Sequence, residues 1–251
     1  MHKPLLVLPV PGLPEIRAGD DLARLILASA AKHRLRLHDG DILVVAQKAV
    51  SKAEGRVYDR AGVEATPFAR EMAAYTGHTP EYMELVLRSS RRIVRMANGL
   101  VIAQTRHGFV MANSGVDSSN AGGEDRMVLL PEDPDASARG IRDAIEAVTG
   151  RTVAVIISDT FGRPWRRGQV NLAVGIAGME PILDYRGRED NDGRTMKATR
   201  IAVADELCSA AELVSGKTRR LPVAIIRGYR FDPAPGTTED LVRDEESDLF
   251  K

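Results

Sequence analysis

A carboxylate, a hydroxyl and three arginines lie close together between residues 159 and 167, and such a set could handle phosphate. Asp159 and Thr160 come directly after residues 152–158, the strongest predicted strand of the sequence, and open α/β sheets usually carry their chemistry at strand ends. A carboxylate and a hydroxyl are hard oxygen ligands that suit Mg²⁺ or Mn²⁺. After a predicted turn at Gly162, guanidinium groups that can bind phosphate follow at Arg163, Arg166 and Arg167. A capped turn beside solvated arginines is the alternative interpretation.

A second polar segment could form another wall of the same site. Residues 113–120 (NSGVDSSN) follow a predicted strand around Val110. Asp117 could be a second metal ligand, and Asn120 could contact the base or ribose of a nucleotide. Loops of Ser, Asn and Gly are also common on protein surfaces. Two strand ends that each present an aspartate favour a shared divalent-metal site.

A third cluster places cations directly after the predicted strand 42–45. Residues 47–56 (QKAVSKAEGR) include Lys48, Ser51 and Lys52, whose side chains could bind anionic oxygens. A plain lysine-rich surface is the alternative.

Several familiar motifs are missing, and their absence narrows the chemistry. Gly216-Lys217-Thr218 resembles the end of a phosphate-binding P-loop, but Ala211 stands where the first glycine belongs and the preceding segment is predicted to be helical. No G-x-G-x-x-G, G-x-S-x-G or H-E-x-x-H motif occurs, which argues against dinucleotide-binding folds, serine hydrolases and zinc proteases. The five histidines show no ligand spacing, and Cys208 is expected to be an inert buried thiol.

The composition is that of an ordinary soluble protein. Lys plus Arg and Asp plus Glu are 35 each in 251 residues, so there is no basic excess of the kind that nucleic-acid binding would favour. No run approaches the ~20 apolar residues of a membrane span, and the N-terminus does not resemble a signal peptide. We expect a cytoplasmic protein with no nucleic-acid or membrane partner.

Strands and helices alternate along the chain, which predicts an α/β or α+β fold. Strands are predicted at 5–8, 42–45, 100–103, 108–111, 152–158 and 223–226. Helices are predicted at 20–31, 67–92, 134–150, 202–214 and 237–248. No repeat or linker is evident, so residues 1–251 are expected to form a single catalytic unit, with two lobes as one way to arrange it.

Taken in order, short motifs along nearly the whole chain resemble those of the coenzyme F-420-0:γ-glutamyl ligase family. They are PGLPE at 11–15, GDDL at 19–22, DGD at 39–41, VSKAEGR at 50–56, GVDSSN at 115–120, LPEDPD at 130–135, DTFGR at 159–163, LDYRG at 183–187, ADE at 204–206 and RG at 227–228.

The resemblance implies a GTP-dependent ligation in coenzyme F-420 biosynthesis. GTP would phosphorylate the terminal carboxylate of F-420-0, a phosphodiester-linked deazaflavin, and the amine of L-glutamate would then displace the phosphate. The resemblance also implies Mg²⁺ or Mn²⁺, with K⁺ as a further candidate cation, and the addition of further γ-linked glutamates by some members. It implies a homodimer with an α+β fold of the family's own, neither Rossmann nor P-loop.

Matching positions give expected roles to individual residues. Asp117, Asp159 and Thr160 match metal-binding positions and are the expected metal ligands. Asp159 and Arg166 are the candidate catalytic residues, Arg166 from the chemistry of the arginine cluster. The expected nucleotide contacts are turn and cationic positions, namely Gly12, Leu13, Pro14, Glu15, Gln47, Lys48, Lys52, Asn120, Ser215, Gly216 and Lys217.

The sequence also departs from the family in two places and leaves two other functions open. Residues 46–48 (AQK) replace the small hydroxyl residues often found there. Some members carry a C-terminal flavin-binding domain, which is expected to be absent here. The alternatives are a nucleotide- or F-420-binding protein without turnover, and a metal-dependent hydrolase of a γ-glutamyl or phosphate bond.

Overall fold

A five-stranded mixed sheet with the strand order β1-β12-β2-β8-β9 forms the centre of the protein. The structure is a computed structural model and describes residues 4–244 and 246–248. Within this sheet β2 and β8 run parallel, and the other neighbours are antiparallel. The strands are β1 (Leu6–Pro9), β2 (Ile42–Ala46), β8 (Ala154–Arg163), β9 (Arg166–Ala177) and β12 (Val223–Arg227). Because β2 and β8 are parallel neighbours, whatever follows each of them lies at the same edge of the sheet.

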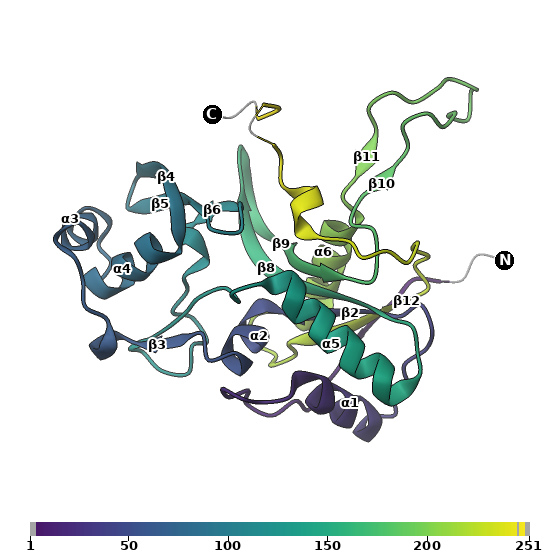
Figure 1. The fold of residues 1–251 in the computed structure, drawn as a ribbon, viewed down its shortest axis with the longest axis horizontal. Helices are drawn as coiled ribbons and strands as arrows, with labels where there is room; N and C mark the ends of the chain where they lie inside the picture. The colour runs from purple at the N-terminus through teal and green to yellow at the C-terminus, as the bar shows by residue number, and fades with distance from the viewer. Residues whose placement is uncertain (1–3, 245, 249–251) are drawn as a thin grey trace.

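Helices cover both faces of this sheet because its inner strands are apolar on both sides. Successive strand residues point to opposite faces, so the continuous apolar runs 42–45 and 154–157 fill two cores. The helices α1 (Leu22–Lys32) and α5 (Pro134–Thr149) pack on one face, and α6 (Val203–Ser215) packs on the other. Figure 1 shows α5 in front of the sheet and α6 behind it.

The starts of α1 and α5 follow from local capping. The Asp21 carboxylate accepts a hydrogen bond from the Arg24 N–H, and the Asp133 carboxylate accepts one from the Ala136 N–H. Each bond satisfies a backbone donor that the first helical turn leaves unpaired. The helices predicted at 20–31, 134–150 and 202–214 are confirmed.

A second part of the chain, residues 57–129, builds its own small core beside the main sheet. It contains α3 (Pro67–Thr76), α4 (Pro80–Ser89) and a three-stranded sheet of β4 (Ser90–Ala97), β5 (Leu100–Thr105) and β6 (Val110–Ala112). Its apolar side chains form a separate buried cluster within residues 63–129. Two short paired strands, β3 (Val57–Asp59) and β7 (Arg126–Val128), join it to the rest. We call this second part the small lobe and the remainder the large lobe.

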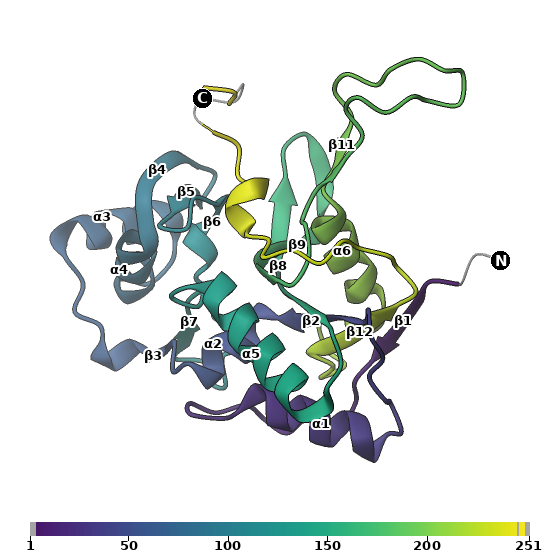
Figure 2. The ribbon, with the colours of Figure 1, turned by 45° about the vertical axis from the view of Figure 1, so that its right-hand side comes forward.

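A two-stranded arm projects from the large lobe (Figure 2). Its base is the pair β10 (Leu183–Asp184) and β11 (Arg200–Ile201). Most residues between the two strands are exposed. The described residues also form three short 3₁₀ turns, η1 (Arg60–Gly62), η2 (Asn113–Gly115) and η3 (Thr238–Leu241).

The expected mixed α+β class, without a Rossmann or P-loop arrangement, is confirmed, but two local predictions were wrong. Residues 67–92 are mostly helical, as predicted, in the two helices α3 and α4, and the last residues of this segment open strand β4 at Ser90. The helix predicted at 237–248 is the single turn η3 in the described part, and residue 245 lies outside the described residues. The strand predicted to end at Ser158 continues to Arg163 and pairs with β9, so Gly162 lies inside a strand.

Candidate active site

An ion pair links the cluster after β2 to the polar loop of the small lobe. Lys48 is the second residue of α2 (Gln47–Ala53), which begins where β2 ends. Its Nζ lies 2.6 Å from Oδ2 of Asp117 and also donates to the backbone oxygen and the hydroxyl of Ser119, both at 2.7 Å. Burial raises the pKa of Asp117, but the hydrogen bonds from Lys48 and the Ser119 N–H outweigh this and hold the pKa below its usual value. Asp117 is therefore ionised and fixed in place.

Asp159 lies on β8 one residue beyond the last pairing with β2, where the body of the sheet ends. The pKa of Asp159 is raised to about 6, chiefly by burial and also by the neighbouring Asp117, while the Thr160 N–H, Lys48 and Lys217 oppose the rise. These charges act on Asp159 because they lie close to it. The structure thus brings together four segments, around residues 48, 117, 159 and 217, that lie about 40 to 70 residues apart in sequence.

Thr160 is held on both sides of its hydroxyl. Lys217 Nζ donates to Thr160 Oγ1, and the hydroxyl donates to Oδ1 of Asn171 at 2.9 Å. The amide of Asn171 in turn donates to Oε2 of Glu212 at 3.0 Å. Asn120 joins the group, since its side-chain amide lies 3.4 Å from the Lys217 carbonyl oxygen.

Asn171 and Glu212 belong to this network, yet neither was selected from the sequence. Asn171 is opposite Thr160 in the β8–β9 pairing, and Glu212 lies on α6. Recognition of the hairpin from residues 154–177 would have placed Asn171 beside Thr160, but no sequence signal identifies Glu212.

The donors near Asp159 fit one Mg²⁺ or Mn²⁺ ion rather than a fully enclosed metal cage. The Asp117 carboxylate is close enough to raise the pKa of Asp159, and burial leaves the Asp159 carboxylate poorly solvated. Mg²⁺ is typically bound by one or two carboxylates, with water and phosphate oxygens completing its shell. Within the described residues, no group of three or more His, Cys, Asp or Glu side chains gathers in a metal-binding arrangement. Thr160 stays a predicted ligand, and its hydroxyl is engaged by Lys217 in this structure.

The predicted nucleotide contacts at the N-terminal turn lie next to α2. Gly12 has a φ of 80°, a left-handed conformation that suits glycine, while Leu13 packs against the core of the large lobe. Lys52 forms an ion pair with Glu15 and so ties this turn to α2. Gln47 is buried, and its amide donates to the Ser51 hydroxyl and the Leu129 carbonyl.

The arginine cluster does not converge on Asp159. Arg163 and Arg166 face each other at the tip of the β8–β9 hairpin, and Arg166 is exposed. Arg163 lies four positions beyond Asp159 along the strand, which corresponds to about 13 Å. Arg163 Nη2 donates to the carbonyl of Arg167 at 3.0 Å, which closes the tip on itself. The catalytic role of Arg166 remains a prediction from its chemistry.

Ser215, Gly216 and Lys217 lie at the C-terminal end of α6. A P-loop instead precedes the helix whose N-terminus binds phosphate. Lys217 nevertheless reaches the site, through its contact with Thr160.

Comparison with known proteins gives a consistent result. A family model described as F420-0:Gamma-glutamyl ligase matches residues 12–228. The chain belongs to this family. Every candidate residue, from Gly12 to Lys217, lies inside the matched segment, and the resemblance seen in the motifs is confirmed.

Three relatives match most of the chain, two of them nearly its full length, and each is called Coenzyme F420:L-glutamate ligase. The protein of Methanothermobacter thermautotrophicus is 44% identical over 246 residues, which cover 96% of this chain and 97% of the relative. That of Methanocaldococcus jannaschii is 43% identical over 216 residues, 86% of each chain. That of Methanopyrus kandleri is 42% identical over 253 residues, 98% of each chain. The family and its relatives are ligases by name, as expected. No helix in the described part of the chain has the length and apolar character needed to cross a membrane.

Proposed function

We propose that this protein joins L-glutamate to coenzyme F-420-0 in a GTP-dependent reaction that passes through an acyl phosphate. The observation that carries the proposal is the meeting of Asp117 and Asp159 with the ammonium groups of Lys48 and Lys217, in a chain of the F420-0:Gamma-glutamyl ligase family. Paired carboxylates that can hold a divalent cation, with lysines beside them, form a set that suits phosphoryl transfer.

The chemistry explains why a nucleotide is needed. A carboxylate does not react with an amine near neutral pH because it has no good leaving group. In the first step a carboxylate oxygen of F-420-0 forms a bond to the γ-phosphorus, the bond from that phosphorus to the β-bridging oxygen breaks, and GDP leaves. In the second step the glutamate nitrogen bonds to the acyl carbon, and the phosphate leaves with the former carboxylate oxygen while the nitrogen loses a proton.

The residues of the site would act by position and charge. Asp117 and Asp159 would hold Mg²⁺ or Mn²⁺, which when bound neutralises phosphate charge. Lys48 fixes Asp117 through their ion pair, and Lys217, held on Thr160, can turn its ammonium toward a phosphate oxygen. The route requires no nucleophilic side chain, and the only cysteine, Cys208, is buried in the core beneath α6.

The resemblance to the family supports the remaining parts of the proposal. Gly12–Glu15, Gln47, Lys52, Asn120 and Ser215–Lys217 are proposed nucleotide contacts. A homodimer, a bound K⁺ ion and the addition of further glutamates are likewise proposed from the family.

The test is to incubate the protein with F-420-0, GTP, L-glutamate and Mn²⁺ and to follow the mass of the cofactor and the release of GDP. One glutamyl residue added for each GDP supports the ligase. GTP loss without addition would indicate the hydrolase, and binding without GTP loss would indicate a binding protein. Asp159→Asn is expected to abolish product formation. Asp192→Asn, the same change on the exposed arm, is the matched control and is expected to retain full activity.

A further inference from the structure

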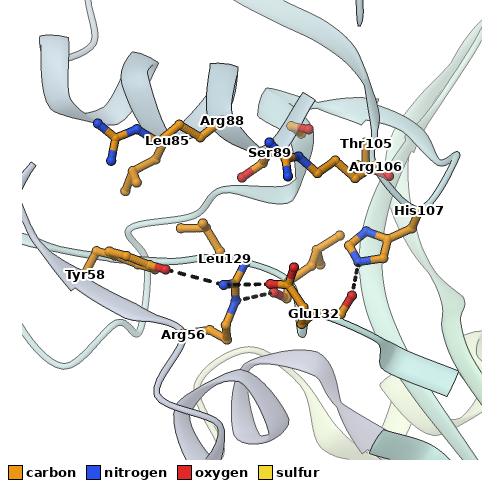
Figure 3. Close-up of a pocket in the computed structure, with 12 residues that line it drawn as sticks. Arg56, Tyr58, Leu85, Arg88, Ser89, Thr105, Arg106, His107, Leu129 and Glu132 are labelled. Atoms are coloured by element: carbon orange, nitrogen blue, oxygen red, sulfur yellow. Dashed lines mark hydrogen bonds and ion pairs between the residues drawn. The ribbon is translucent and has the colours of Figure 1, made fainter. Parts of the chain in front are cut away.

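A cavity of about 420 Å³ lies between the small and large lobes, apart from the carboxylates described above. Its apolar wall is formed by Leu85 of α4 together with Leu129 and Leu130, which follow β7. Polar side chains from α4, from the β5–β6 turn and from the start of β3 and the residue before it surround this wall (Figure 3). A volume of this size and a mixed lining are typical of sites for medium-sized organic molecules.

Two arginines approach the cavity from opposite sides (Figure 3). Arg56 is held in place, because its guanidinium lies 2.9 Å from the Glu132 carboxylate and donates to the Leu130 carbonyl at 3.1 Å. Arg106, on the β5–β6 turn, extends over Ser89 on the other side. Among the described residues, the Arg106 guanidinium has no hydrogen-bond or ion-pair partner. It is therefore the cation of this cavity that is available to a ligand.

Two buried polar atoms at the cavity also lack partners, namely Nδ1 of His107 and Oγ of Ser114. Such atoms usually find a hydrogen bond, since leaving them unpaired costs free energy. Nε2 of His107 lies 3.0 Å from the Pro131 carbonyl oxygen, which can only accept, so Nε2 carries the hydrogen and Nδ1 of the neutral ring is an acceptor. The cavity thus offers an acceptor at His107 and donors at Ser114 and Arg106.

The cavity is also within reach of the reaction centre. Ser114 lines it, and Asp117 follows three residues later, a separation of at most about 10 Å along the chain. None of the proposed nucleotide contacts, such as Gly12, Lys52 or Lys217, lines the cavity. A molecule in this cavity would therefore reach Asp117 from the side of the small lobe without competing for the nucleotide positions.

We propose that the cavity between the lobes holds the flat ring end of the acceptor substrate, while the tail of the acceptor leads its carboxylate to Asp117 and Asp159. This assignment rests on the proposed function. The ligand class is a heteroaromatic ring system with a carbonyl edge and a ring N–H. The ring contacts the leucine wall, its N–H donates to His107 Nδ1, and its polar edge accepts hydrogen bonds from Arg106 and Ser114.

The test compares Arg106→Ala with Arg95→Ala, which removes an exposed arginine on β4 that does not line the cavity. Binding of F-420-0 is measured by titration calorimetry without GTP, and KM is measured for F-420-0 and for GTP. Arg106→Ala is expected to weaken F-420-0 binding and raise its KM about tenfold, the loss expected for one hydrogen bond to a charged group. KM for GTP should stay at the wild-type value, Arg106→Lys should recover part of the affinity, and Arg95→Ala should match wild type.

Three outcomes would overturn the assignment. They are an unchanged affinity for F-420-0 in Arg106→Ala, a rise in KM for GTP as large as that for F-420-0, or an equal loss in Arg95→Ala. The wild-type protein is assayed first. If it makes no glutamylated product, the proposed function itself is wrong. Thermal unfolding of each variant shows whether it is folded, which is expected because the Arg106 side chain is exposed.

Discussion

Asp159 is expected to destabilise the protein when no metal is bound, because its carboxylate sits where a negative charge is poorly solvated. Burial raises the pKa of Asp159 from 3.8 to about 6. A group with a higher pKa in the folded state binds protons more readily folded than unfolded, so the free energy of unfolding falls as pH rises between the two values. Asp159→Asn removes this charge while keeping the shape of the side chain and an oxygen that can accept from the Thr160 N–H.

The size of the effect follows from the pKa change. The pKa of Asp159 rises by roughly two units, and each unit corresponds to about 1.4 kcal/mol. Above pH 6, Asp159→Asn should therefore raise the free energy of unfolding by at most ~3 kcal/mol. Solvent still reaches part of the Asp159 side chain, so the measured gain in the variant is expected to lie below this limit. Below about pH 4 the Asp159 carboxyl is protonated in both the folded and the unfolded wild type, so the gain in stability of the variant should vanish.

The assay is urea unfolding of the metal-free protein, compared at about pH 7.5 and pH 4. Asp159→Asn should raise the free energy of unfolding at the higher pH and have little effect at the lower. Asp117→Asn is the matched contrast: the pKa of Asp117 is held low by Lys48, so removing its charge should destabilise the protein at the higher pH. Mn²⁺ should stabilise the wild type and not Asp159→Asn. A metal-free Asp159→Asn protein that is less stable than wild type at the higher pH would refute the reasoning.

Three further outcomes are expected. Activity should rise with pH as Asp159 ionises, between about pH 5 and pH 8. Lys48→Met removes a positive charge that lowers the pKa of Asp159, so the midpoint of this rise should move to higher pH. An unmoved midpoint in the pH–rate profile would contradict this. Arg227→Met leaves the buried Asp41 carboxylate without its two guanidinium hydrogen bonds. It should lower the free energy of unfolding in urea by about 3–5 kcal/mol. A loss below 1 kcal/mol would show that the pair contributes little. Cys208→Ala should leave kcat unchanged, since burial raises the pKa of this thiol well above its usual value, and a large fall in kcat would point to a covalent role.

The sequence predicted the meeting of Asp117 and Asp159 because both follow apolar runs that form strands, and the structure places their charges close together. The same logic failed at the arginines. The strand was expected to end at Ser158 and the chain to turn at Gly162, yet the strand continues and carries Arg163 and Arg166 to the tip of a hairpin. No local signal marks that hairpin, since its outer half is polar and its register shifts beside Ser158.

The small lobe shows a similar limit. Strand β4 carries arginines at 91, 92 and 95, which give it the polar character of an exposed helix face, and so it was joined to the preceding helix. The neighbouring strand β5 makes this segment a strand, because Val101 and Ala103 of β5 are fully buried and β4 pairs with β5 along its length. Contacts that depend on such pairings, including the bond between Asn171 and Thr160 and the cavity between the lobes, could not be derived from sequence spacing.

The central claim is that the acceptor carboxylate is activated as an acyl phosphate at the Asp117–Asp159 site, and heavy-oxygen transfer tests it most directly. F-420-0 labelled with heavy oxygen in its terminal carboxylate is converted with GTP, L-glutamate and Mn²⁺, and the inorganic phosphate is analysed by mass spectrometry. We predict one labelled oxygen in the phosphate for each glutamyl residue added. Glutamylated product accompanied by unlabelled phosphate would contradict the acyl-phosphate route.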